Sequence, residues 1–365
     1  MHKRKTDVCI TGIGVVSAVG NTLADFTEGI NRFQHPFIRQ SNPHIFKNNR
    51  IPVSPAQGID TADPEKRLLS MGKSAIQDAL HTRGGTSLPD MRRMCLIAGS
   101  GMGFTDTYFE DPSKYDNPEY LSSLAHTLAQ ITELHCDTVY IGSACAAGSQ
   151  ALSYGMDLVQ AVIYDLVIAG GVDILSRAAC AGFLRLHAID PDGCRPFDAN
   201  RQGIAVGEGA VFYTLERRES CAEHRSIYAS LPAAGITCDA HHIVQMAPDG
   251  AEAVRAMEQA ISRAGADKTE VDCIVAHGTG TIQNDKLESQ MIRSCFGGHA
   301  EHIYVTAPKG VLGHTGGTSG AFGLLTAIST FTAGKIPPIA NLEKPDPACS
   351  LRLVTQQSVP YTVKL

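Results

Sequence analysis

The chain has 365 residues, of which 43% are hydrophobic, and its formal net charge is -6. This composition allows a large core in two domains or one large α/β unit, and it excludes a fibrous or disordered protein. The acidic balance argues against nucleic acid as a ligand. The basic first residues pass at once into a strand-like segment, with no apolar run of signal-peptide or membrane-span length. We therefore expect a cytoplasmic protein that binds neither nucleic acid nor membrane.

Short apolar segments alternate along the chain with longer segments of helical period, which predicts an α/β fold. The expected strands are VCITGIG (8–14), CLIAGSG (95–101), TVYIGSA (138–144), DLVIAGG (165–171), AVFYTLE (210–216), DCIVAHG (272–278), IYVTAPK (303–309) and LRLV (351–354). Helices are expected at Pro64–Thr82 and Gly250–Ala264, among others. Several strands end in glycine-rich turns, as in a layered sheet whose loops converge on one site.

Two of these segments resemble each other. TVYIGSAC (138–145) and DCIVAHGTGT (272–281) both pass from a strand into a turn of small residues that carries a reactive side chain. This similarity predicts a duplicated core with a seam near residues 220 to 250.

The eleven cysteines are scattered, without a C-x-x-C pair. Most are expected to be small buried hydrophobic residues. The nearest candidates for metal ligands are the pairs His241–His242 and His299–His302, and neither has cysteines at zinc-finger spacing. We therefore expect no metal site.

Cys145 differs from the other cysteines because it lies at the tip of a turn between a strand and a helix of small residues. The dipole and free N–H groups of a helix N-terminus favour a thiolate, so the thiol pKa should fall and the sulfur should become a nucleophile. A packed core cysteine is the alternative interpretation. Other residues of the chain are needed to distinguish a nucleophile from a packed core cysteine.

Two histidines occur in matching contexts. His277 ends an apolar strand in VAHGTGT, and His314 lies in a glycine-rich loop five residues after Lys309. Either one alone would be typical of a structural histidine. A cysteine with two imidazoles distant in sequence is the arrangement expected for acyl transfer through a thioester, where a neutral imidazole donates a hydrogen bond to a developing oxyanion.

The sequence resembles the β-ketoacyl-acyl-carrier-protein synthases, the ketosynthases of the thiolase-like fold. The resemblance rests on CITGIGVVSAVGN, GSACAAGSQA, LVIAGGVD, RPFDANRQGIAVGEGA, AHGTGT, APKGVLGHTGGTSGA and PPIANLEKPDPAC, which occur in the family's order over nearly the whole chain. It implies a five-layered α/β/α/β/α fold made of two related halves, residues 1–220 with the nucleophile and residues 221–365 with the two histidines.

The resemblance also implies roles for individual residues. Cys145 would take an acyl group from an acyl-carrier protein, and His277 and His314 would assist decarboxylation of a malonyl-carrier thioester and stabilise the enolate. Lys309 would hold this network. Two further sets match substrate contacts: Thr279 and Thr281 match threonines on the phosphopantetheine arm, and Phe183 matches an aromatic residue near the acyl pocket. No cofactor is expected beyond the phosphopantetheine of the carrier protein, which carries the substrates.

Three features depart from the family pattern. The chain stops at QSVPYTVKL, before a Gly-Phe-Gly-Gly-Thr-Asn loop that shares the oxyanion hole in the family, so we expect a second half truncated at its C-terminus. Losing one oxyanion donor costs roughly 10²–10³ in rate. Gly323 replaces a glutamate and Gly310 replaces a serine.

These departures leave two main interpretations open. The chain is either an active 3-oxoacyl-carrier-protein synthase of fatty-acid or polyketide synthesis, or a non-catalytic chain-length factor that dimerises with a full-length ketosynthase. Thiolase chemistry is disfavoured because the late Cys349 lies in a segment that matches a non-catalytic part of the synthases.

Partners follow from the same resemblance. The family dimerises through the strand before the cysteine, here DTVYIG (137–142), and the incomplete C-terminus favours a heterodimer over a homodimer. An acidic acyl-carrier protein should dock on Lys66, Arg67 and Lys73, since opposite charges steer such encounters.

Overall fold

The computed structural model describes residues 7–41, 50–84, 93–111, 113, 119–221, 226–242 and 245–362. The basic start of the chain, residues 1–6, lies outside this part. Among the described residues, no helix combines the length and apolar character that crossing a membrane requires. The same residues contain no group of three or more His, Cys, Asp or Glu side chains that could hold a metal ion.

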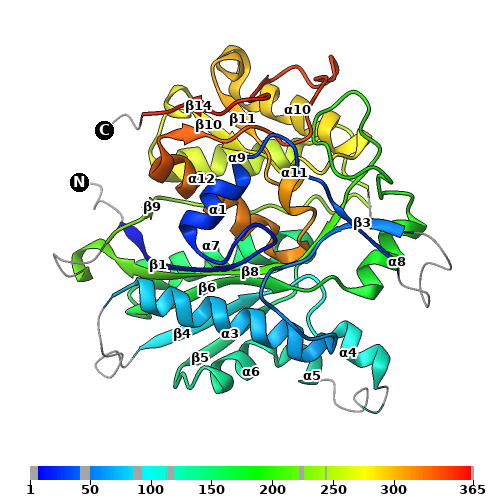
Figure 1. The fold of residues 1–365 in the computed structure, drawn as a ribbon. Coiled ribbons are helices and arrows are strands. Elements are labelled where there is room, and N and C mark those ends of the chain that lie inside the picture. The colour runs from blue at the N-terminus through cyan, green and yellow to red at the C-terminus, as the bar shows by residue number, and fades with distance from the viewer. Residues whose placement is uncertain are drawn as a thin grey trace.

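Helices and sheets alternate in five layers (Figure 1). One outer layer contains α3 (Pro64–Thr82) and α6 (Leu124–Ile131), and the central layer contains α7 (Ala147–Gln160) and α12 (Ser319–Ala333). The opposite outer layer contains α9 (Ala251–Ala264) and α10 (Ile282–Phe296). A six-stranded sheet and a three-stranded sheet separate these layers, as the predicted α/β/α/β/α fold requires.

The larger sheet has the strand order β5-β4-β6-β8-β1-β9. Its strands are β1 (Val8–Val16), β4 (Met94–Gly99), β5 (Asp137–Ile141), β6 (Leu166–Asp173), β8 (Gly209–Arg217) and β9 (Ala229–Leu231). β4 is parallel to β5 and β6, whereas β8 is antiparallel to β6 and β1. Helices cover both faces, which explains why every residue of β1, β4 and β6 is buried and nearly all of them are apolar.

The smaller sheet contains the parallel strands β10 (Cys273–Val275), β11 (Tyr304–Thr306) and β13 (Arg352–Leu353). The remaining strands are β2 (Ile38–Ser41), β3 (Arg50–Ser54), β7 (Val206–Gly207), β12 (Lys335–Ile336) and β14 (Val359–Pro360). The remaining helices are α1 (Leu23–Ile30), α4 (Thr105–Glu110), α5 (Glu119–Ser122), α8 (Arg177–Arg185) and α11 (Lys309–Leu312).

Small side chains allow α7 to lie between the two sheets. Ala147 and Ala151 are fully buried, and a Cβ on Gly155 would lie 3.0 Å from Val167 Cγ1 on β6. The helix therefore approaches the sheet closely, and its N-terminus lies directly after the Cys145 turn. The segment expected to start the second half is continuous with the first sheet, because β9 pairs with β1. The boundary at residue 220 remains a prediction.

Candidate active site

Cys145 lies in a short 3-10 turn, Ala144–Ala146, between the end of β5 and the start of α7. Ala144 has a φ of +49°, a left-handed conformation that is strained for a residue with a Cβ and turns the chain sharply at this point. The expectation of a lowered thiol pKa is wrong. Burial raises the pKa of Cys145 above its ordinary value, and the nearby Lys309 charge only partly opposes this effect.

His314 contacts this sulfur directly, with Nε2 3.2 Å from Cys145 Sγ. The backbone N–H of Gly316 donates to Nδ1 at 3.1 Å, so the proton of the neutral ring is on Nε2 and points at the sulfur. Desolvation lowers the pKa of His314 to about 3, which keeps the ring neutral. Its backbone is fixed to β7 through Gly207 N, which donates to His314 O at 3.0 Å.

His277 follows the end of β10 and faces His314 edge-on, with 5.6 Å between the ring centroids. Lys309 Nζ lies 3.2 Å from His277 Nδ1 and donates to His277 O at 2.6 Å. An ammonium can only donate, so Nδ1 is the acceptor and the ring proton is again on Nε2. The Lys309 charge holds the pKa of His277 well below its usual value. The site therefore contains two neutral imidazoles with Nε2–H donors.

Lys309 is itself buried, which lowers its pKa, while the carboxylate of Glu288 on α10 opposes this shift. Glu288 accepts from the backbone N–H groups of His277 at 2.6 Å and Gly278 at 2.8 Å. The sequence-based predictions did not include Glu288. The family pattern places a glutamate at position 323, where this chain has glycine, whereas the structure supplies a carboxylate eleven residues after His277.

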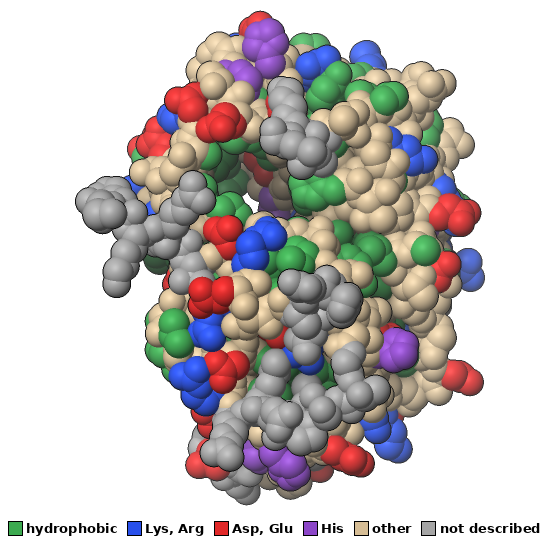
Figure 2. Space-filling model, turned by 90° about the vertical axis from the view of Figure 1, so that its left-hand side faces the viewer, with side chains coloured by type: hydrophobic (Ala, Val, Ile, Leu, Met, Phe, Trp, Pro, Cys, Tyr) green, Lys and Arg blue, Asp and Glu red, His purple; other side chains and the backbone are tan. Residues whose placement is uncertain are grey.

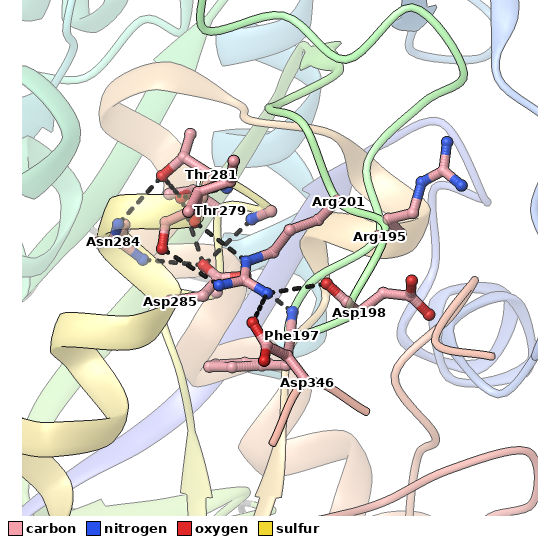
Figure 3. A network of polar contacts seen from close by, with 12 residues as sticks. Arg195, Phe197, Asp198, Arg201, Thr279, Thr281, Asn284, Asp285 and Asp346 are labelled. Atoms are coloured by element: carbon pink, nitrogen blue, oxygen red, sulfur yellow. Dashed lines mark hydrogen bonds and ion pairs between the residues drawn. The ribbon is translucent and has the colours of Figure 1, made fainter. Parts of the chain in front are cut away.

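Thr279 and Thr281 lie together at the start of α10, with their Oγ1 atoms 2.9 Å apart (Figure 3). Thr281 caps the helix by accepting from Asn284 N. Asp285 accepts from Gly280 N at 3.2 Å and from Phe197 N at 2.7 Å, so it ties the threonine turn to the 195–201 segment.

Arg201 connects this turn to the rest of the site. Its guanidinium is buried and donates to the carbonyl oxygens of Thr281 at 3.3 Å and Ile282 at 3.1 Å. It also pairs with Asp346 at 2.6 Å and lies 3.5 Å from Asp285. Figure 3 shows the side chain directed into this cluster, whereas Arg195 points away. In the sequence, Arg201 is marked only by its place inside the motif RPFDANRQGIAVGEGA, which does not reveal this role.

Phe183 on α8 lies beside His314, with 5.7 Å between the ring centroids. It is partly buried in a cluster with Cys180 and Ile204. The structure therefore brings the predicted aromatic residue to the Cys145–His314 pair. Figure 2 shows a face of the molecule that is deeply hollowed, with a histidine side chain visible at the wall of the hollow.

Arg67 does not offer the free charge that was expected. Its guanidinium forms a bidentate pair with buried Glu208 and donates to the carbonyl oxygens of Ile59 and Thr61. Lys66 and Lys73 on the same helix remain exposed. They line a hollow of about 480 Å³ together with Ile59, Leu69 and Ile131, among others.

Comparison with known proteins agrees with this geometry. Residues 46–220 match the family described as Beta-ketoacyl synthase, N-terminal domain, and residues 228–343 match Beta-ketoacyl synthase, C-terminal domain. The chain belongs to the β-ketoacyl synthase family. Its resemblance to ketosynthases is thereby confirmed.

Individual members support the assignment along the whole chain. The 3-oxoacyl-[acyl-carrier-protein] synthase 2 of Synechocystis sp. is 30% identical over 390 residues, covering 97% of this chain and 92% of that protein. The solved ishigamide ketosynthase/chain length factor superposes with a TM-score of 0.86 at 29% identity, covering 98% of this chain and 94% of that one. A β-ketoacyl synthase from Burkholderia phymatum STM815 gives a TM-score of 0.85 at 28% identity, covering 97% and 93% of the two chains. The chain is thus a thiolase-like ketosynthase-type subunit of fatty-acid or polyketide biosynthesis.

Proposed function

We propose that this chain carries out decarboxylative condensation at Cys145, with both substrates delivered on the phosphopantetheine of an acyl-carrier protein. The observation that carries this proposal is the 3.2 Å contact between Cys145 Sγ and the Nε2 of a neutral His314. A chain retained only as a scaffold has no need of a nucleophile, a neutral donor and a buried lysine within one cluster.

The first step is acyl transfer. The Cys145 sulfur attacks the carbonyl carbon of the acyl-carrier thioester, and the carrier thiol leaves with the proton that the cysteine gives up. Lys309 favours the thiolate by its charge, while burial disfavours it. The thioester formed on Cys145 stays beside the two imidazoles.

The second step is decarboxylation. A malonyl-carrier thioester loses carbon dioxide, and its electron pair moves into an enolate whose oxygen becomes negative. The Nε2–H groups of His277 and His314 are the donors for this oxygen, and buried, preorganised donors of this kind stabilise developing charge more than water does. The carbanion then attacks the acyl carbon on Cys145, and the cysteine sulfur leaves as the 3-oxoacyl-carrier product forms.

Thr279 and Thr281 would bind the phosphopantetheine arm of the carrier protein. Thr279 and Thr281 present two hydroxyls next to His277, and Arg201 and Asp285 fix their turn. Hydroxyl groups at this place can donate to or accept from the amides of a phosphopantetheine arm. The carrier protein itself is acidic, and the hollow between exposed Lys66 and Lys73 suits it.

The chain would act as a dimer through β5. This strand is an edge of the six-stranded sheet, is only partly buried, and pairs only with β4 among the described residues. An open strand edge is a template for pairing with another chain. The partner would be a related ketosynthase subunit or a second copy. The structural relative named as a ketosynthase/chain length factor supports the heterodimer.

The second candidate function is a chain-length factor that shapes the product tunnel of a partner. The glycines at 310 and 323, which replace family side chains, favour it. The two functions separate in one experiment, which uses intact mass after incubation of the chain, alone and with its partner, with hexanoyl-carrier protein. A hexanoyl adduct on wild type that is absent in Cys145→Ala supports the enzyme. Product formation by the pair that survives Cys145→Ala unchanged would establish the chain-length factor instead.

A further inference from the structure

Asp173, the last residue of β6, is a buried carboxylate that the mechanism above does not use. It accepts four hydrogen bonds. Ser100 Oγ donates at 2.6 Å and Met102 N at 3.1 Å to Oδ1, and Gly101 N at 2.7 Å and Gly317 N at 2.5 Å donate to Oδ2. All four partners donate to the carboxylate and lower the pKa of Asp173, but burial is the larger effect and raises that pKa above its ordinary value.

These donors belong to two loops that flank the reactive pair. Gly317 directly follows Gly316, whose N–H fixes the Nδ1 of His314. Gly101 follows Ser100, whose N–H donates to the carbonyl of Ile141 at 3.0 Å, at the end of the strand that leads to Cys145. Asp173 therefore joins the loop of the imidazole to the region of the nucleophile.

The packing around this carboxylate leaves no space for side chains. A Cβ on Gly317 would lie 2.4 Å from Gly101 N and 3.0 Å from the carbonyl oxygen of Ala144, the residue before Cys145. A Cβ on Gly148 would lie 2.8 Å from Gly317 O. The two loops and the nucleophile turn are thus in direct backbone contact.

We propose that Asp173 is a positioning residue that keeps the Nε2–H of His314 against the Cys145 sulfur. It acts on His314 through the 316–317 backbone, which holds the ring in one tautomer, and it touches neither reacting atom. Its charge also raises the thiol pKa of Cys145, so the His314 tautomer is the readout that reports the positioning role alone. This inference deepens the proposed condensation at Cys145 and rests on it for its consequence in catalysis.

Asp173→Asn tests the proposal because it keeps the size of the side chain. The asparagine side chain has only one accepting oxygen, whereas the carboxylate has two. Its NH₂ group would therefore face backbone N–H groups, which would lose their acceptor. The 316–317 turn should shift, and a displacement of about 1 Å can cost ~10²-fold in rate. The probe is hexanoyl N-acetylcysteamine thioester, with the rate of Cys145 acylation followed by intact mass. We expect a 10- to 100-fold loss, by the same estimate.

Glu216→Gln is the matched control. Glu216 is also a buried carboxylate of the six-stranded sheet, and it accepts from Thr11 and Arg83. Gly209 on β8 is the residue that pairs with Asp173, and Glu216 lies seven residues after it on the same strand. At the rise of a β-strand, Glu216 is therefore ~23 Å from Gly209. The control should acylate at the wild-type rate even if its thermal stability falls.

Imidazole ¹⁵N spectra give a readout that general loss of stability does not change. The wild-type His314 ring should show only the Nε2–H tautomer, and Asp173→Asn should show a mixture. If Asp173→Asn does not fold, Ser100→Ala removes one of the four donors to Asp173, together with the acceptor of Gly103 N, and should lose about 3- to 10-fold in acylation, a smaller part of the same effect.

Wild-type rate with an unchanged tautomer in Asp173→Asn or Ser100→Ala would overturn the proposal, as would an equal loss in Glu216→Gln. A wild-type chain that is never acylated would refute the proposed function instead, and the spectra would still test Asp173.

Discussion

Gly310 and Gly323 both replace larger residues of the family pattern, yet the structure gives them opposite surroundings. A Cβ on Gly310 would lie 2.4 Å from the carbonyl oxygen of Ala340, whereas ordinary contacts begin at 3.4 Å. The neighbouring Asn341 donates to Gly310 O at 2.9 Å and to Cys194 O at 3.1 Å, which holds this segment close. The nearest atom to a Cβ on Gly323 is Val275 Cγ1, at 3.9 Å.

We therefore expect opposite effects from the same substitution. Gly310→Ala forces α11 or the 340–341 backbone to move by about 1 Å, and such overpacking costs about 1–3 kcal/mol. Gly323→Ala meets no obstacle and should gain about 0.5–1 kcal/mol, the usual advantage of alanine over glycine inside a helix. The free energies of unfolding of the two variants should differ by about 1.5–4 kcal/mol, measured by urea denaturation.

Activity should follow the same division. Lys309 precedes Gly310, so a shift of α11 moves the ammonium away from His277, and carbon dioxide release from malonyl-carrier protein should fall by about 10²-fold. Gly323→Ala should keep the wild-type rate. The reasoning would be refuted if Gly310→Ala were as stable and as active as wild type, or if Gly323→Ala were equally damaging.

Three further outcomes are expected. Because burial raises the thiol pKa of Cys145, its alkylation by iodoacetamide should keep accelerating as the pH rises through 9, without a plateau near neutrality, as peptide mass mapping can measure. Because the pKa of His314 is about 3, decarboxylation should lack an acid limb near pH 6.5, and a half-loss there in a pH–rate profile would contradict the neutral ring. Arg201→Lys cannot reach both carbonyls and Asp346 together, so the KM for the carrier substrate should rise about tenfold while acylation of Cys145 by a small thioester is unaffected.

Much of the fold was predictable because its strands are continuous apolar runs and its turns are rich in glycine. The helix expected at Pro64–Thr82 has these bounds in the structure, since Asp63 caps its N-terminus and Pro64 fits its first turn. The strand expected at LRLV is shorter, with β13 limited to Arg352–Leu353. Leu351 instead forms a local bond from its N–H to Cys349 O, whereas Val354 N still donates to Val305 O on β11.

The candidate site was predictable only in part. Cys145, His277, His314 and Lys309 lie in conspicuous turns, and the structure brings them together; their catalytic roles remain predictions. The sign of the thiol pKa could not be predicted, because desolvation depends on side chains distant in sequence. Glu288 was missed for a related reason: its role depends on the contact between α10 and Lys309, which no local pattern reveals.

The buried charges of the site favour retained chemistry independently of the resemblance to ketosynthases. Burying an ammonium is costly unless a carboxylate compensates it, and here Lys309 is buried with Glu288 close enough to oppose its pKa shift. That charge in turn lowers the pKa of His277 and favours the Cys145 thiolate. A scaffold subunit would be more stable with apolar side chains in these places. The charged cluster is costly to bury, and it acts electrostatically on Cys145 and His277. It therefore favours an active condensing subunit over a non-catalytic chain-length factor.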